Sequence, residues 1–474
     1  MNLESELTIF ILCILSIILN ETIGYHEIGI IFVVIQIVLI LFYFLKNNYL
    51  KSLYLFFIFT LTALEFPADL QNRPNIHTFR TVDIFGFSVS TWILILFFLY
   101  FSFIKGYFLK VFKHLTKEQI ILYLLFFSSI LIGVAGNIFS DYNIQYFVKD
   151  LQYFLVIFFS FHLFLFVKSS ETHQVFENII LYTLISRSWI SFLGINFGLM
   201  KGNYGGIATF SYEPIDILII FLIFAVSRNN SFLKNSVILI SWVLGIISSV
   251  FIQSSGKSIL LLFIVLIEIL VLVLKSKNNI LKNPIFKVFV LLSVVVIVIV
   301  ISNLLESVKE RNLLLSIKLN QAQSLVQLDW LKDPYKLPNS PRDRVLEIYN
   351  TFYYYVDNPY FFPLGAGIGG YFKESKYYNY TANDQGGYST YEVESRHFYS
   401  PHESPANVFL KFGIAGVIIY VWLLLIILRD KENSLFFKNI AFFLVLLFIG
   451  FSIKLAIIIS YCLSNIFFKE KVNN

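Results

Sequence analysis

The chain is a succession of long apolar segments, and this pattern alone nearly fixes its fold class. A helix that crosses a bilayer needs roughly 17 to 25 mainly apolar residues. Such runs recur along 474 residues, of which 57% are hydrophobic and 14% charged, with a mean hydropathy of +0.74. A soluble globular domain is less apolar than this. We therefore expect an all-α polytopic membrane protein with about 14 transmembrane helices.

The candidate membrane helices are apolar runs completed by aromatic or polar residues at the membrane interface. They lie at 7–19, 28–45, 50–64, 88–104, 120–139, 151–167, 179–199, 215–226, 236–252, 259–274, 286–305, 408–428, 436–451 and 455–468. Only residues 452–454 separate the last two runs, so one long helix is the alternative there.

Basic residues gather in alternate loops between these runs. By the positive-inside rule these loops, and with them both termini, face the cytoplasm. The opposite loops are poorer in Lys and Arg for their length and are expected to be extracytoplasmic; they include 20–27, 65–87, 140–150, 200–213 and 306–407. The net charge of +6 is thus a topology signal and does not indicate a nucleic-acid surface.

A polar stretch of about a hundred residues divides the chain into three parts. Residues 1–305 hold predicted helices 1–11, residues 306–407 form a large extracytoplasmic loop between helices 11 and 12, and residues 408–474 hold helices 12–14 and a cytoplasmic tail. Inside the loop, helical spacing predicts helices over 304–331 and 344–356. The glycine-rich run 363–370 neither follows a predicted strand nor opens a helix, so a dinucleotide site is not indicated.

His402 is the strongest candidate for a catalytic residue. It stands at the end of the large loop, where water meets the next apolar helix. An imidazole titrates near neutrality and suits a general base, and Glu403 or Glu394 could orient it. His397 is the competing base, and a purely structural role is the alternative for His402.

Several cations are candidates for binding an anionic substrate. Arg187 lies inside an apolar run, where a charge costs at least ~2.5 kcal/mol, and a guanidinium matches phosphate oxygens. Lys257 lies in a tight turn whose backbone amides also suit a phosphate. Arg342 and Arg344 precede the second loop helix. The alternatives are a salt bridge or a later helix start for Arg187, and an ordinary hydrophilic hairpin for Lys257.

Two segments have the composition of a carbohydrate-binding surface. Residues 202–214 combine glycines and aromatics with Tyr212 and Glu213, and residues 371–399 are rich in Tyr, Asn, Ser and Glu. Aromatic and small polar side chains suit the face of a sugar. Flexible polar connections share this composition, and for 202–214 composition alone favours that alternative.

Four short patches resemble the O-antigen polymerase and O-antigen ligase superfamily. They are Arg187, the run Gly206-Ile207-Ala208-Thr209-Phe210-Ser211-Tyr212-Glu213-Pro214, the run from Arg342 through Asn358-Pro359 to Gly369, and the run from His402 to Gly416. The last two patches are the most specific. Together the four cover well under a fifth of the chain, and the helices match only as hydrophobicity.

This resemblance implies a GT-C-like glycosyltransferase in the bacterial inner membrane, with its active site on the periplasmic side. It implies that a glycan is transferred from undecaprenyl diphosphate to an acceptor hydroxyl with inversion, without a nucleotide sugar, metal or cofactor. His402 would take the acceptor proton, and Arg187 would meet the diphosphate. Lys257 falls where relatives often show Ser-Arg, and Glu403 replaces the usual Asn after the histidine.

The remaining site candidates are the second catalytic residue Glu403 and the substrate-binding residues Lys257, Arg342, Arg344, Glu213 and Tyr212. The implied partners are an undecaprenyl-diphosphate-linked oligosaccharide, membrane lipid, a chain-length regulator and a flippase. Nucleic acid is not among them.

Within the superfamily we favour a polymerase of O-antigen or related repeat units, because the helix number and the Glu213-Pro214 patch look closer to that branch. A ligase that transfers the glycan to the lipid A-core of lipopolysaccharide is the first alternative. A metal-dependent enzyme that uses Glu65, Asp69 or Asp83 is another. A transporter or flippase is the last, although the chain lacks the two similar halves typical of transporters.

Overall fold

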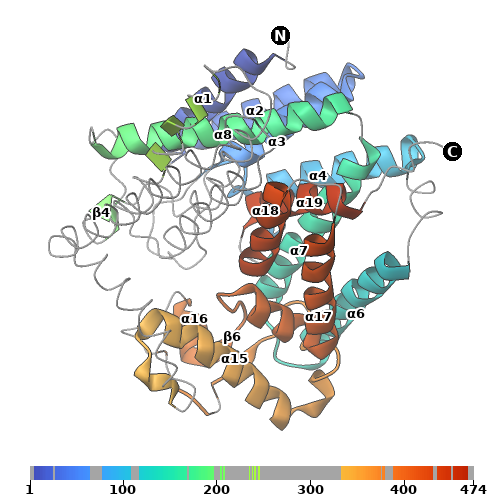
Figure 1. Cartoon of the computed structure of the whole chain (residues 1–474), viewed down its shortest axis with the longest axis vertical. Coiled ribbons are helices and arrows are strands. Elements are labelled where there is room, and N and C mark those ends of the chain that lie inside the picture. Colours follow the sequence, from blue (N-terminus) through green and yellow to red (C-terminus); the bar gives the residue numbers. More distant parts are fainter. Residues whose placement is uncertain are drawn as a thin grey trace, which may run out of the picture. The chain divides into compact units, whose positions relative to one another are not determined.

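The computed structural model describes most of the chain outside its middle (Figure 1). The described residues are 5–24, 27–63, 77–107, 117–167, 170–196, 333–374, 376–378, 380, 388–430, 435–449 and 452–467, with single residues and pairs between 203 and 245. They fall into two compact units, which are described separately. The first comprises Met1–Thr183, Ser211–Glu213 and Arg342–Asn474, and the second comprises Leu184–Phe210 and Pro214–Pro341.

The described part is mostly helical. Its helices are α1 (Glu6–Ile23), α2 (Ile28–Leu45), α3 (Tyr49–Thr62), α4 (Val89–Leu99), the π-helix η1 (Tyr100–Ile104), α6 (Lys117–Phe139), α7 (Ile144–Phe166), α8 (Ser170–Asn196), the 3-10 helix η4 (Pro334–Lys336), α15 (Asn339–Asp357), the 3-10 helix η5 (Pro359–Phe361), α16 (Thr390–Ser395), α17 (Ser404–Arg429), α18 (Leu435–Phe448) and α19 (Ile453–Phe467). Its strands form antiparallel pairs: β1 (Asp83–Ile84) with β2 (Phe87–Ser88), β3 (Asn203–Tyr204) with β4 (Ile207–Ala208), and β5 (Phe372–Lys373) with β6 (His397–Phe398).

Five of the described helices are long and apolar enough to cross a membrane. They are Glu6–Ile23, Ile28–Leu45, Ile120–Phe139, Ile144–Phe166 and Ser404–Arg429. This confirms a mostly helical protein with several membrane-span candidates. Separate helices α18 and α19 replace the alternative of one long helix. Apart from single residues and pairs, the predicted spans between 215 and 305 and the predicted helix over 304–331 lie outside the described residues.

Two helices begin earlier than hydropathy predicted. Helix α7 starts at Ile144 and not at 151, and α8 starts at Ser170 and not at 179. Polar residues such as Lys149 and Asp150 lie in these added turns. A hydropathy criterion excludes them, although their backbone continues the helix. In the first unit α7 packs against α19 and α4, and α17 packs against α18 and α6 (Figure 1).

The turn between α6 and α7 packs against the large loop. The Tyr142 hydroxyl donates a hydrogen bond of 2.8 Å to the Ala366 carbonyl, and the Tyr146 hydroxyl lies 2.6 Å from that of Ser389. Sequence analysis placed both segments on the extracytoplasmic side. Their direct contact agrees with their lying on one side of the membrane.

The large loop has a core of its own, made mainly of aromatic side chains. Its buried members are Tyr354, Tyr355, Ala366, Tyr371, Phe372, Tyr380, Tyr388, Val393, Phe398, Tyr399 and Leu410. Each tyrosine brings a hydroxyl that needs a partner when it is buried. The Tyr355 hydroxyl meets this need by donating to the Leu410 carbonyl at 2.6 Å, which ties the loop core to α17.

Helix α17 is broken at Gly413, and backbone groups in and next to the glycine-rich run form hydrogen bonds with the helix backbone at the break. Gly413 has φ 60° and ψ −154°, outside the helical region. The backbone N–H of Ile414 donates to the Phe362 carbonyl at 3.0 Å, and the Ala366 N–H donates to the Leu410 carbonyl at 2.9 Å. Gly365 makes this approach possible, because a Cβ there would lie 2.5 Å from the backbone carbonyl carbon of Lys411. The glycines thus serve backbone packing.

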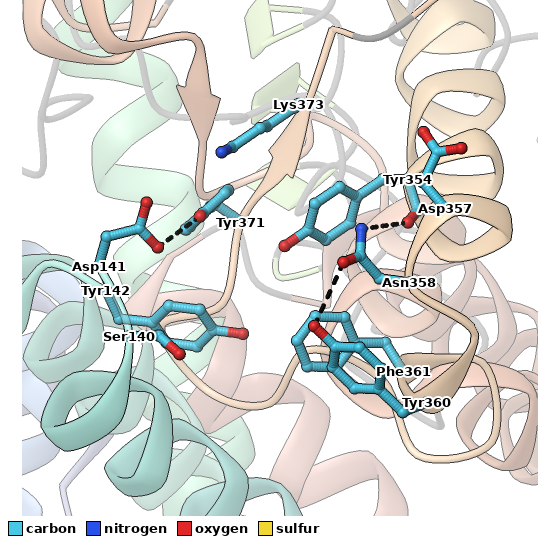
Figure 2. Close-up of a pocket in the computed structure, with 10 residues that line it drawn as sticks. All are labelled: Ser140, Asp141, Tyr142, Tyr354, Asp357, Asn358, Tyr360, Phe361, Tyr371 and Lys373. Carbon is cyan, nitrogen blue, oxygen red and sulfur yellow. Dashed lines mark hydrogen bonds between the residues drawn. The ribbon is translucent and has the colours of Figure 1, made fainter.

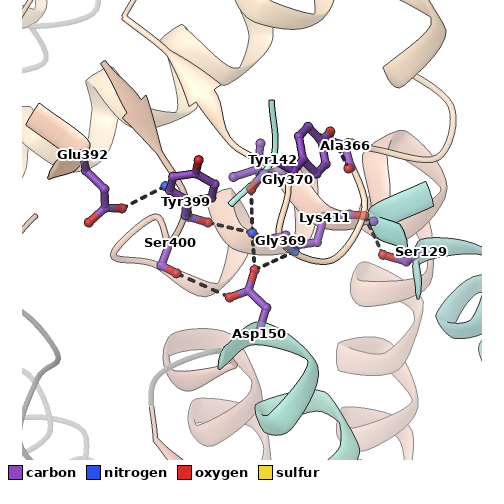
Figure 3. A network of polar contacts seen from close by, with 12 residues as sticks. Ser129, Tyr142, Asp150, Ala366, Gly369, Gly370, Glu392, Tyr399, Ser400 and Lys411 are labelled. Atoms are coloured by element: carbon purple, nitrogen blue, oxygen red, sulfur yellow. Dashed lines mark hydrogen bonds and ion pairs between the residues drawn. The ribbon is translucent and has the colours of Figure 1, made fainter. Parts of the chain in front are cut away.

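A buried ion pair between Lys411 of α17 and Asp150 of α7 holds the same region together (Figure 3). The Lys411 ammonium also donates to the carbonyls of Gly370 and Tyr399, each at 2.7 Å. Asp150 in turn accepts a bond of 3.0 Å from the Gly369 N–H. The Lys411 side chain is fully buried, so these contacts replace its lost hydration.

We expect Gly365→Ala to destabilise the protein more than Gly106→Ala. Both glycines have positive φ, so both substitutions strain the backbone by about 1–2 kcal/mol. Only at Gly365 would the new methyl group also overlap the backbone of α17, whereas Gly106 has open space around it. The midpoint of thermal unfolding in detergent measures the difference. Equal midpoints for the two variants would contradict the close approach at Gly365.

We expect Asp150→Asn to lower the free energy of unfolding by about 3–5 kcal/mol, because it leaves the buried Lys411 charge uncompensated. The double variant Asp150→Asn with Lys411→Met removes that charge and should recover much of the loss. Thermal unfolding of the two proteins in the same detergent tests this. A double variant no more stable than the single one would show that the charge is not the cause.

Candidate functional site

Helix α15 carries several polar residues of the large loop, among them Arg344 and Glu347. Asn339-Ser340-Pro341 opens it, and proline is tolerated there because N–H groups in the first turn have no partner within the helix. It ends at Asp357, before Asn358-Pro359. The helix predicted over 344–356 is confirmed, with an earlier start. Arg344 and Glu347 are three residues apart and therefore share one face.

The Glu347 carboxylate and the His402 imidazole form the central pair of the site. Glu347 Oε1 contacts His402 Nδ1, and Oε2 accepts a hydrogen bond of 2.9 Å from the His402 backbone N–H. Oε1 also accepts hydrogen bonds from the hydroxyls of Tyr380 at 3.0 Å and Tyr388 at 2.8 Å. The Glu347 side chain is fully buried, whereas that of His402 is 23% exposed. His402 is thus held by Glu347 through both its Nδ1 and its backbone N–H.

The two partners shift each other's pKa toward the charged forms. Burial alone would lower the pKa of His402 and raise that of Glu347, because each charged form loses water. The opposite charge of the partner and their mutual hydrogen bond outweigh burial. The pKa of His402 is therefore raised above its ordinary value, and the pKa of Glu347 is lowered. Below the raised pKa the pair is an imidazolium with a carboxylate, and above it His402 is a neutral imidazole held by Glu347.

The carboxylates that sequence analysis offered as orienting groups lie elsewhere. Glu403 Oε1 pairs with Arg344 Nε at 2.6 Å, and Glu394 on α16 is exposed. Glu347 takes the orienting position instead. A catalytic role for Glu403 stays a prediction, and its contact with Arg344 keeps both residues close to His402 in the site.

His397, the competing base, has a different environment. Its ring stacks on Tyr371 with 4.0 Å between the ring centroids, and its Nε2 lies 3.7 Å from Asp141 Oδ2. Burial, and then the nearby charge of Lys373, lowers the pKa of His397. No orienting contact like that of Glu347 on His402 is present for it among the described residues.

The structure brings only part of the predicted substrate-binding set together. Arg344 lies beside the central pair through Glu403, and the partly buried Arg342 is in the first turns of the same helix. Arg187 is 2% exposed within α8 and belongs to the second compact unit. Outside the described residues lie Lys257, Tyr212 and Glu213. Their roles stay predictions.

The site is suited to acid–base chemistry. It offers one imidazole, a carboxylate that orients it, two tyrosine hydroxyls and a guanidinium. Within the part of the chain that the structure describes, no group of three or more His, Cys, Asp or Glu side chains could hold a metal ion. Of the acidic residues considered for a metal-dependent reaction, Asp83 is exposed on β1, and Glu65 and Asp69 lie outside the described residues.

Sequence reasoning missed Glu347, which lies 55 residues before His402. The helix that carries it was predicted, and so was its neighbour Arg344. A signal was present: a carboxylate one helical turn after Arg344 shares the face that sequence analysis assigned to substrate. Nothing in the sequence paired that face with His402, because the pairing depends on how α15 packs against the start of α17.

We expect His402 to titrate above the ordinary histidine pKa of about 6.5. In Glu347→Gln the opposing charge is lost while burial remains, so the pKa of His402 should fall below that of the wild type. NMR titration of histidine-labelled protein, with His402→Ala to assign the resonance, measures both values. Glu394→Gln, which changes an exposed carboxylate, should leave the titration unchanged. A His402 pKa that Glu347→Gln does not lower would contradict the pairing.

Residues 239–421 match the family model described as O-antigen ligase. That stretch contains α15, the glycine-rich run, Glu347, His402 and most of α17. No curated protein and no solved structure matches the chain. The prediction from the sequence patches is thereby confirmed: over residues 239–421 the chain resembles the O-antigen polymerase and O-antigen ligase superfamily.

Proposed function

We propose that this protein polymerises lipid-linked oligosaccharide repeat units of O-antigen or a related surface polysaccharide. The observation that carries the proposal is the His402–Glu347 pair at the start of α17, inside the stretch that matches the O-antigen ligase family. A base fixed by a buried carboxylate is suited to activating a sugar hydroxyl. The donor is a glycan on undecaprenyl diphosphate, and the acceptor is a second lipid-linked glycan.

In the proposed reaction the acceptor oxygen attacks the anomeric carbon on the face opposite the diphosphate. Its proton passes to Nε2 of neutral His402 while the new C–O bond forms. The bond to the diphosphate oxygen breaks, and undecaprenyl diphosphate leaves with the bonding electrons, so the configuration inverts. No metal or cofactor takes part in this sequence.

The leaving diphosphate gains negative charge, which positive side chains stabilise. We assign this role to Arg187, Lys257, Arg342 and Arg344. The position of Arg187 within an apolar run, and the match of a guanidinium to phosphate oxygens, support its assignment. Tyr212 and Glu213 are assigned to the sugar, and Glu403 to holding Arg344 beside His402.

The proposed architecture is GT-C-like, with about 14 transmembrane helices. Residues 1–305 and 408–474 form the membrane part, and residues 306–407 form the large loop on the periplasmic side of the inner membrane. Contacts of the α6–α7 turn with this loop support their lying on one side. A flippase would supply the donor to that side, and a chain-length regulator would act on the product.

A ligase is the second candidate, because the matching family model is described as O-antigen ligase. It would use the same donor and the same base, and would transfer the glycan to lipid A-core. Deletion of the protein separates the two candidates. Single repeat units accumulating on their carrier indicate a polymerase, whereas polymer stranded on its carrier indicates a ligase.

We expect purified protein in liposomes to extend a lipid-linked repeat unit into polymer, read as a ladder on a gel. His402→Ala should slow the reaction by about 10²–10⁴-fold, the usual worth of a general base. Arg187→Ala should slow it as well, because charge on the diphosphate is no longer neutralised. Glu394→Gln serves as the matched control for an exposed acidic residue of the same loop.

Other outcomes would overturn parts of the proposal. If His402→Ala and Arg187→Ala both make full-length product at the normal rate, the site assignment is wrong. Loss in His397→Ala alone would identify the competing base. Inactivation by a chelator would support a metal-dependent enzyme, and transport of the lipid-linked sugar without bond formation would support a flippase.

A further inference from the structure

A polar cavity of about 300 Å³ lies between the turn after α6 and the large loop (Figure 2). This volume is at the lower end of the range for small-molecule sites. Four segments of the first unit line it: the turn after α6, the end of α15, the 3-10 helix η5, and β5. None of its lining residues belongs to the proposed catalytic set.

The β5–β6 ribbon separates this cavity from the catalytic pair. Phe372 is paired with Phe398, and their rings stack at 5.3 Å. Phe398 also packs on Tyr388 at 4.8 Å, and Tyr388 lies 4.9 Å from the His402 ring. This face of the ribbon therefore supports the catalytic pair.

The opposite face of the ribbon points to the cavity. Successive side chains of a strand alternate between its faces, so Tyr371 and Lys373 lie opposite Phe372. Both line the cavity. Tyr371 and Lys373 therefore lie on the face of the ribbon opposite to Phe372 and Phe398, the face that packs toward His402 through Tyr388.

The cavity combines buried aromatic walls with one exposed aromatic ring. Tyr354 is 8% and Tyr371 3% exposed, whereas Tyr360 at the rim is 70% exposed. The Tyr360 hydroxyl donates to Asn358 Oδ1 at 3.2 Å, and the Asn358 amide donates to the Tyr354 carbonyl at 2.9 Å. Asn358 therefore links the exposed ring to the wall. An exposed ring beside polar groups offers a platform for a ligand with one apolar face.

Two carboxylates and one ammonium set the charge of the cavity. Asp141 accepts a bond of 2.6 Å from the Tyr371 hydroxyl, and its side chain is 59% exposed. Partial burial would raise the pKa of Asp141, but the Tyr371 hydrogen bond and nearby charges outweigh it and lower that pKa, so the group is ionised at neutral pH. Asp357 is exposed, and Lys373 is the cation of the cavity. An anionic ligand would meet two negative charges against one positive charge.

We propose that this cavity binds a neutral sugar ring of the glycan, at a distance from the reacting sugar. The apolar C–H face of a pyranose packs on Tyr360, and its hydroxyls donate to Asp141 and Asp357. That the sugar belongs to the acceptor glycan rests on the proposed function. Binding of a neutral sugar itself rests only on the cavity.

Binding is tested directly on the full chain in lipid nanodiscs. Maltotriose, triacetylchitotriose and mannotriose are the neutral probes, trigalacturonate is the anionic probe, and saturation-transfer NMR titrations measure affinity. We expect at least one neutral probe to bind more tightly than trigalacturonate. Tyr360→Ala and Asp357→Asn should each weaken that binding by about 3- to 10-fold. Tyr378→Ala is the matched control, since Tyr378 is 64% exposed on the same loop and does not line the cavity.

Failure of this inference and failure of the proposed function give different results. His402→Ala should bind the neutral probe normally and transfer glycan about 10²–10⁴-fold more slowly. With a lipid-linked substrate, Tyr360→Ala should raise KM for the acceptor several-fold at unchanged kcat, as loss of remote binding does. If no neutral probe binds, or if Tyr360→Ala and Tyr378→Ala bind alike, the sugar site is wrong whatever the activity. If a probe binds as expected and wild type forms no glycosidic bond, the proposed function fails and the sugar site stands.

Discussion

The backbone N–H and C=O groups at a break in a membrane helix must form hydrogen bonds with other parts of the protein, because hydrocarbon offers them no partner. Helix α17 breaks at Gly413, and the run around Gly365 supplies the missing donors and acceptors. Side-chain contacts of Lys411 with Asp150 and with two loop carbonyls reinforce the same junction. The large loop is thereby fixed to α17, which begins at Ser404, two residues after His402. The His402–Glu347 pair and most of the residues that line the cavity belong to the loop that this junction holds.

Two buried pairs, Asp150–Lys411 and Glu347–His402, are stabilised in the same way but differ in what they hold in place. Each costs hydration and is sustained by additional hydrogen bonds: carbonyls for Lys411, tyrosine hydroxyls for Glu347. The Asp150–Lys411 pair joins α7 to α17, and the Lys411 ammonium also bonds two carbonyls of the large loop, which suits an anchor. The pKa of His402 is raised by Glu347, whose hydrogen bond holds the imidazole in either protonation state.

Hydropathy predicted the helices whose whole length is apolar, and α2 matches its predicted range from Ile28 to Leu45. It failed at polar helix ends such as the first turns of α7. For the glycine-rich run 363–370, sequence analysis concluded only that a dinucleotide site is not indicated, because nothing in the sequence shows that its backbone packs against α17. His402 was singled out by its position at a helix mouth. Glu347 was not, because tertiary packing alone brings it to the imidazole. Among residues 371–399, whose composition suggested a sugar surface, Tyr380 and Tyr388 are instead buried core that bonds Glu347.

The β5–β6 ribbon is a partition only two residues long on each strand. His397 and Phe398 are neighbours on β6, so a displacement of one displaces the other. The ribbon therefore connects the cavity on one face with the surroundings of the His402 ring on the other. A ligand that shifts the ribbon would also change the surroundings that set the proton affinity of His402. By thermodynamic linkage, if a bound saccharide changes the proton affinity of the imidazole, protonation of the imidazole changes the affinity for the saccharide by the same factor.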